Sequence, residues 1–185
     1  MTVNGKSQTS TFNILKDPRI NTTQSDFRDQ FDLLMDIRNR TTEINEKVLT
    51  IRSIKSQINT LTNLMKDSGF KNDQLTQAGD SLVKSLSSIE EELIQVKSKS
   101  GQDPLNYPIK LDNKIAALVG VISSVDAKPT AQSYDVLDDL VTLAKVHFKK
   151  LDKVLTVDLF KFNNMVSDAA VPAVMIVPSE MSKER

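Results

Sequence analysis

A long stretch in the first half of the chain carries apolar residues in the four-three alternation of a heptad repeat. The spacing holds from Ile37 to Met65, with Thr41 and Lys55 as polar interruptions. A heptad repeat places its apolar positions on one face of an α-helix. We therefore predict a helix over about residues 23–67, extended to the N-terminal side by Phe27, Phe31 and Leu34. It would be about 65 Å long.

Both ends of this helix carry capping signals. Thr23 precedes Asp26 by three residues, which is a capping-box arrangement with aspartate in the usual place of glutamate. Gly69 follows the last apolar position, and glycine is favoured just past a helix C-terminus because it tolerates positive φ. These signals bound the helix independently of the heptad spacing.

Three further helices follow from the same kind of pattern. They are predicted over residues 73–99, 111–126 and 130–168, with a kink or restart near Asp158. Gly79 occupies one apolar position of the second pattern, which indicates a close contact with another helix. In the third pattern, Ala116, Ala117 and Gly120 are small enough for close packing.

The composition suits this helical interpretation. Of the 185 residues 39% are hydrophobic and only 5% aromatic, with no tryptophan, so the core is aliphatic. We predict an all-α fold, an up-down four-helix bundle with long coiled-coil-like helices and a short N-terminal β-hairpin. The alternative is a three-helix coiled coil whose middle member is interrupted. The choice depends on whether residues 103–110 reverse the chain or carry it on along the same line.

The two ends of the chain differ from the helical body, which spans residues 20–170. Residues 1–19 read as a β-hairpin remnant and linker, since Asn4-Gly5 is a tight-turn dipeptide and Phe12 and Ile14 alternate after it. A hairpin without a partner sheet is marginal in water, which favours a strand pair detached from a larger β domain. Residues 171–185 are expected to form an extended, disordered tail.

The segment between the second and third helices has too specific a sequence to be an ordinary linker. We predict a structural motif, because prolines set backbone shape without supplying reactive groups. Asp103 is expected to tie down the turn, while Leu105, Tyr107 and Ile109 dock on the bundle. The motif consists of Asp103, Pro104, Leu105, Asn106, Tyr107 and Pro108.

Charge and residue chemistry exclude several classes of function. The chain has 24 basic and 24 acidic residues and a pI near 6.6, so no net field draws it to nucleic acid or to an anionic membrane. It has no cysteine and one histidine, His147, which is interpreted as a residue at the border of a helix's apolar stripe. Glu90 to Glu92 and Asp138-Asp139 are interpreted as solvated helix faces, since neighbours on a helix point in different directions. We expect no catalytic residues, no metal and no cofactor.

The segment Gln102–Leu118 resembles the C-terminal helical region of sortilin-like, BNR-repeat β-propeller proteins, which are largely bacterial and often labelled glycosyl hydrolases. Flanking sequences fit the same family: Asp17-Pro-Arg19, Gln30-Phe-Asp-Leu-Leu34, Lys128-Pro-Thr-Ala-Gln-Ser-Tyr134 and Val171-Pro-Ala-Val174. The resemblance implies an exported parent protein in which a propeller comes first and an immunoglobulin-like β domain can follow. Residues 2–15 would then be the last strands of that domain. Phe160 stands where the family has proline, which puts the kink there in question.

These observations support one functional hypothesis and two alternatives. The first is a non-catalytic C-terminal helical module with a structural or protein-interaction role, whose partners are the preceding domains or a second copy. No nucleic acid, membrane or small-molecule substrate is expected. The main alternative is a free-standing helical adaptor or oligomerisation domain that binds partner helices. A helical enzyme with an unrecognised pocket is the third.

Overall fold

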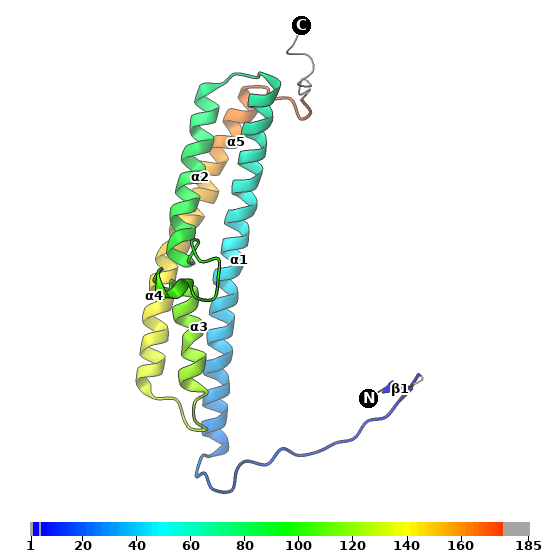
Figure 1. The fold of residues 1–185 in the computed structure, drawn as a ribbon, viewed down its shortest axis with the longest axis vertical. Coiled ribbons are helices and arrows are strands. Elements are labelled where there is room, and N and C mark those ends of the chain that lie inside the picture. Colours follow the sequence, from blue (N-terminus) through cyan, green and yellow to red (C-terminus); the bar gives the residue numbers. More distant parts are fainter. Residues whose placement is uncertain (1, 4, 176–185) are drawn as a thin grey trace.

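The structure is a computed structural model of the chain and describes residues 2–3 and 5–175. It is predominantly helical (Figure 1). In chain order the helices are α1 (Gln24–Ser68), α2 (Asp73–Leu93), α3 (Leu111–Ile122), α4 (Ala131–Lys153) and α5 (Leu159–Asp168). A 3₁₀ turn, η1 (Asp103–Leu105), lies between α2 and α3, and a π-helical turn, η2 (Val154–Asp158), joins α4 to α5.

The helices form three rods that lie side by side, rather than four. Helix α1 runs the length of the molecule, α2 and α3 follow one another along it, and α4, η2 and α5 return as one continuous rod (Figure 1). Contacts with α1 move steadily toward its N-terminus as the middle rod proceeds. Gly79 lies beside Ile58, Glu90 pairs with Arg52, and Ile122 accepts a hydrogen bond from Gln30.

The predicted reversal between the second and third helices, and with it the up-down four-helix bundle, is therefore wrong. Helix α3 continues in the direction of α2, antiparallel to α1. The alternative of three rods with an interrupted middle member describes the molecule. The reason is length: α2 and α3 have 21 and 12 residues against 45 in α1, so only end-to-end placement covers the apolar face of α1.

The heptad pattern of α1 is confirmed by burial. From Ile37 to Met65 one buried apolar residue recurs every seven positions, and the polar interruptions Thr41 and Lys55 are only half-buried. The buried apolar residues of α1 are Leu33, Ile37, Ile44, Val48, Ile51, Ile58 and Met65. Near the N-terminus the prediction is wrong for Phe31, which is 61% exposed, because Leu33 takes the inward position there.

Both predicted caps of α1 are present. The Thr23 side chain accepts from the backbone of Asp26, and the Asp26 carboxylate accepts in return from Thr23. Gly69 adopts a left-handed conformation with φ 78°, and the Phe70 amide donates to the Met65 carbonyl at 2.9 Å. This is the arrangement in which a glycine closes a helix C-terminus.

Helices α2 and α3 both end earlier than predicted. Helix α2 stops at Leu93 rather than near residue 99, and Ile94 is extended. Helix α3 stops at Ile122 rather than near residue 126. The predicted stripe members Val96 and Val125 are 38% and 62% exposed. The predicted apolar stripes extend past the helix ends because spacing alone does not show where the neighbouring helices stop covering a helix.

The return rod is predicted correctly in extent but not in detail. Asp158 makes no side-chain cap, and the helix runs through η2 without a break. The π-helical turn inserts one extra residue into the helical register at the place where the kink or restart near Asp158 is predicted. Phe160 follows the turn and is 62% exposed.

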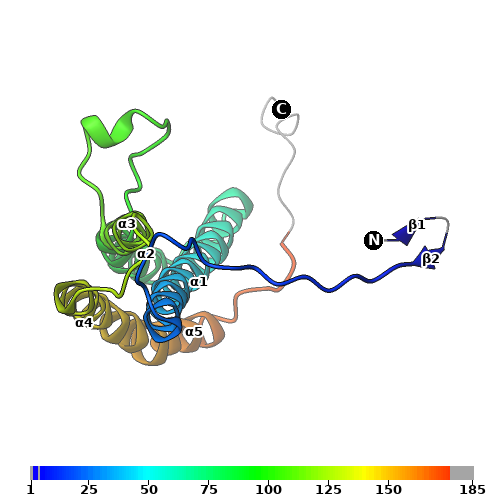
Figure 2. The same cartoon turned by 90° about the horizontal axis from the view of Figure 1, so that it is seen from below.

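The N-terminal segment stands away from the rods in both views (Figures 1 and 2). Two-residue strands, β1 (Thr2–Val3) and β2 (Lys6–Ser7), pair antiparallel. Residues 8–17 carry no strand, so the predicted strand through Phe12 and Ile14 is not formed. At the other end, Met175 packs against the core and its sulfur accepts from the Ser68 hydroxyl at 3.2 Å. The expected disorder of the last residues lies outside the described ranges.

Candidate functional site

Asp103 organises the segment between α2 and α3. Its carboxylate accepts from the backbone amide of Lys99, from the amide of Ser100 at 2.7 Å and from the Ser100 hydroxyl at 2.9 Å. These hydrogen bonds, those from the two amides first, lower the pKa of Asp103. Its carbonyl accepts from the amides of Asn106 and Tyr107 at 2.9 and 2.8 Å. The prediction that Asp103 ties down this turn is confirmed.

The apolar residues of this segment do not dock on the rods as predicted. Leu105 is 87% exposed, and Ile109 and Tyr107 are 41% and 36% exposed. The loop lies at mid-height of the molecule (Figure 1) and projects outward from the rods (Figure 2). Because α2 and α3 are collinear, the chain between them makes an outward excursion, and the side chains at its tip have no core to enter.

The remaining contacts of the motif hold the base of the loop. The Gln95 side-chain amide donates to the Pro108 carbonyl at 2.8 Å. The Lys97 ammonium lies 6.0 Å from the centre of the Tyr107 ring, within range of a cation–π interaction. Asn106 follows η1 as its C-cap, and Pro104 is the second residue of that turn. The motif therefore forms a loop that projects from the rods.

Glu90 is the buried charge that the sequence interpretation missed. Its side chain is 6% exposed and pairs with Arg52 Nε at 2.6 Å and with Lys55 Nζ at 2.9 Å. Burial raises the pKa of Glu90, but the hydrogen bonds and charges of the two basic residues outweigh burial and leave the pKa below its ordinary value. The prediction that Glu90 to Glu92 form a solvated helix face is therefore wrong for Glu90. Its place four residues after Leu86 and three before Leu93 was the available signal.

Gln30 joins the N-terminal part of α1 to the C-terminal end of α3. It is buried, and its side-chain amide donates to the carbonyls of Ile122 and Val125 at 2.8 and 2.7 Å. The Lys128 ammonium also reaches the Asp29 carboxylate at 3.2 Å. Gln30 lies seven residues before Ile37, so the heptad extended backwards would have predicted its burial.

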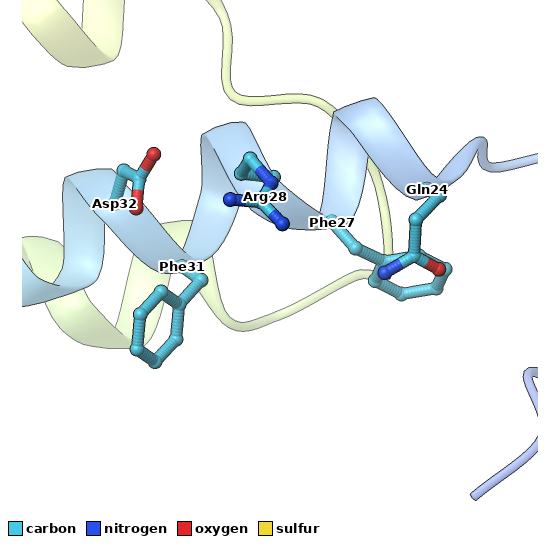
Figure 3. A pocket seen from close by; sticks show the side chains of 5 residues that line it. All are labelled: Gln24, Phe27, Arg28, Phe31 and Asp32. Atoms are coloured by element: carbon cyan, nitrogen blue, oxygen red, sulfur yellow. The ribbon is translucent and has the colours of Figure 1, made fainter.

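A shallow hollow of about 260 Å³ lies over the first turns of α1 (Figure 3). All of its lining residues come from that one helix, so it is a surface depression rather than a cleft between elements. Phe31 presents its ring to solvent there, and Phe27 is half-buried. The lining residues are Gln24, Phe27, Arg28, Phe31 and Asp32.

Two further titratable groups are partly buried near the interruption. His147 is half-buried, as expected for a residue at the border of the apolar stripe, and burial, then the charge of Lys150, lowers its pKa. One carboxylate oxygen of Asp112 is buried without a hydrogen-bond partner, and burial raises the pKa of that group. Within residues 2–3 and 5–175, no group of three or more acidic, histidine or cysteine side chains could hold a metal ion.

Comparison with known proteins adds no relative: the chain matches no protein family, no curated sequence and no solved structure. Among the helices that the structure describes, none is long and apolar enough to cross a membrane.

Proposed function

We propose that the chain is a non-catalytic C-terminal helical module of a larger β-propeller protein, with a structural or protein-interaction role. The sequence resemblance described above motivates this proposal. The observation that carries it in the structure is the N-terminal arm, residues 8–15. Phe12, Ile14 and Leu15 in this arm are 81%, 88% and 84% exposed.

The arm has the chemistry of a strand that adds to a sheet. Threonine, aromatic and β-branched residues alternate in Thr9-Ser-Thr-Phe-Asn-Ile14, and these types favour extended, half-buried backbone. The turn at Asp17–Arg19 separates the arm from α1, with both oxygens of the Asp17 carboxylate bound by the Arg19 guanidinium. An extended segment of this kind binds by pairing with a sheet edge. The hairpin at residues 2–7 fits the last strands of a preceding β domain.

The helical body supports a structural role. Its rods pack through aliphatic side chains, and the buried carboxylate of Glu90 pairs with Arg52 and Lys55 between α1 and α2. Among the other ionised groups, Lys128 pairs with Asp29 of α1, and Asp103 fixes the turn between α2 and α3. The aliphatic packing and the ion pairs between helices suit a module that spaces a preceding domain or packs against it.

The experiment compares the chain alone with the protein encoded by its whole reading frame. The double variant Phe12→Ser/Ile14→Ser should leave the melting temperature of the isolated chain unchanged, because both side chains are solvated there. In the longer protein it should make the arm cleavable by protease. Val121→Ser, another exposed apolar position at 63%, is the control and should not change cleavage. A reading frame that holds no upstream β domain would contradict the proposal.

The second candidate is a helical adaptor or oligomerisation domain that binds partner helices. It is favoured by exposed apolar residues on the outer side of α4, where Val136, Leu143 and Val146 are 45%, 53% and 47% exposed.

A further inference from the structure

Helix α4 carries a second heptad pattern on the side that faces away from the core. Its inward residues Leu137, Val141, Ala144 and Leu151 are buried. The outward positions, again at alternating spacings of three and four, are exposed. They are Val136, Asp139, Leu143, Val146, Lys150 and Lys153. We call this set the outer seam of α4. Helix α4 itself lies at the edge of the bundle (Figure 2).

Opposite charges lie on the two sides of the apolar centre of the outer seam. The apolar pair Leu143 and Val146 lies at the centre, Asp139 precedes it, and Lys150 follows it by the same number of residues. Asp139, Lys150 and Lys153 form no salt bridge within the part of the chain that the structure describes. The regular helix ends at Lys153, where η2 shifts the register, so the seam is confined to α4.

From this pattern we infer that the outer seam is an interface between two copies of the chain, with their α4 helices antiparallel. In antiparallel coiled coils, each a position faces a d position of the partner. Leu143 then faces Val146 of the second copy. In the same register, Asp139 faces Lys150, and Val136 faces the aliphatic stem of Lys153. Symmetry repeats each contact, so the interface is self-complementary.

The parallel arrangement is disfavoured by the same residues. A parallel pair would place Asp139 against Asp139, Lys150 against Lys150 and Lys153 against Lys153. Facing like charges destabilise a helix pair, whereas opposite charges set partner and orientation. The seam therefore selects both a second copy as the partner and the antiparallel direction. The pairing uses no residue of the N-terminal arm and does not depend on the module proposal.

The test is sedimentation of the full chain over a range of concentrations, with charge-reversal variants. The unmodified protein should form a reversible dimer that weakens with salt. Asp139→Lys or Lys150→Asp alone should weaken dimerisation about tenfold or more, because each places two like-charge pairs in the interface. The double variant Asp139→Lys/Lys150→Asp should restore dimerisation, since every facing pair is again opposite in charge.

Two neighbouring positions provide matched controls. Asp138 and Lys145 are exposed on the same helix but point away from the seam, since neighbours on a helix lie about 100° apart. Asp138→Lys and Lys145→Asp change the net charge equally and should leave dimerisation unaltered. Phe12→Ser/Ile14→Ser should also leave it unaltered, which separates this inference from the arm proposal.

Three results would overturn the inference. The first is an unmodified chain that stays monomeric up to about 1 mM, where even a weak pair would be populated. The second is single reversals without effect, as a parallel pair predicts. The third is control variants that weaken dimerisation as much as the seam variants do.

Discussion

At the scale of single residues, polar side chains determine how the rods are held in register. Glu90 joins α2 to Arg52 and Lys55 of α1, and Gln30 joins α1 to the end of α3. Both are more than nine-tenths buried, so each hydrogen bond is made in a place where an unpaired group is costly. These two residues align the middle rod at two separate heights along α1.

Glu90→Gln should lower the free energy of unfolding by about 2 kcal/mol at pH 7, because it removes the charge that Arg52 and Lys55 neutralise. Partial exposure of Arg52, at 54%, keeps the effect below that of a fully buried pair. Glu91→Gln, on the exposed neighbour, is the control and should change stability by less than about 0.5 kcal/mol. Urea denaturation measures both.

The contribution of Glu90 to the free energy of unfolding should also depend on pH. The folded-state pKa of Glu90 lies below its ordinary value of 4.5, so its stabilisation is complete above that value and is lost as the pH falls through the folded-state pKa. The difference between the unmodified chain and Glu90→Gln should therefore shrink when denaturation is repeated near pH 3. A difference that stays constant with pH would contradict the assigned role of the carboxylate.

At the scale of elements, two glycines in helices have opposite environments. A Cβ on Gly79 would lie 3.2 Å from a methyl carbon of Ile58, 3.2 Å from one of Thr62 and 3.4 Å from the Phe162 ring. This confirms the prediction of a close helix contact. At Gly120 a Cβ would meet nothing within 4 Å, so the small residue there is not required for close packing, contrary to expectation.

Gly79→Leu should therefore lower the free energy of unfolding by about 2 kcal/mol through overpacking between α1, α2 and α5. Gly120→Ala should raise it by about 0.5–1 kcal/mol, since alanine is the better helix former and has room. Thermal unfolding followed by circular dichroism measures both. A loss of stability in Gly120→Ala would show that this position is packed against something.

At the scale of the whole molecule, the interruption between α2 and α3 separates the loop from the core. Between Val96 and Ile109, the described side chains are exposed except that of Asp103, which is half-buried. The two halves of the middle rod are held by their separate contacts with α1 and with the return rod. The loop connects them without contributing to the core.

A protease site inserted between Ser98 and Ser100 should therefore be cleaved without loss of helical content. The cut chain should remain one species in gel filtration, and its unfolding should become dependent on concentration, because the covalent connection no longer limits separation. The same site inserted after Asn59 in α1 is the control and should unfold the protein. Loss of helicity after loop cleavage would contradict this view of the interruption.

The sequence alone determined the elements that depend on local chemistry. The capping box at Thr23, the glycine at the end of α1, the heptad face of α1 and the role of Asp103 all follow from residues near one another in the chain. Local signals of this kind act over one or two helical turns, so they can be recognised without knowing which helix packs alongside. The buried Gln30 was also within reach of the heptad pattern.

Only the tertiary structure decided the direction of α3, the ends of α2 and α3 and the exposure of Leu105. Each depends on which surface of α1 is covered and for what length, which spacing within one helix does not encode. An apolar residue is buried only where a neighbouring rod reaches it, as Val125 and Phe31 show by their exposure. The length match between α1 and the two collinear helices is the physical reason that the chain runs on rather than turning back.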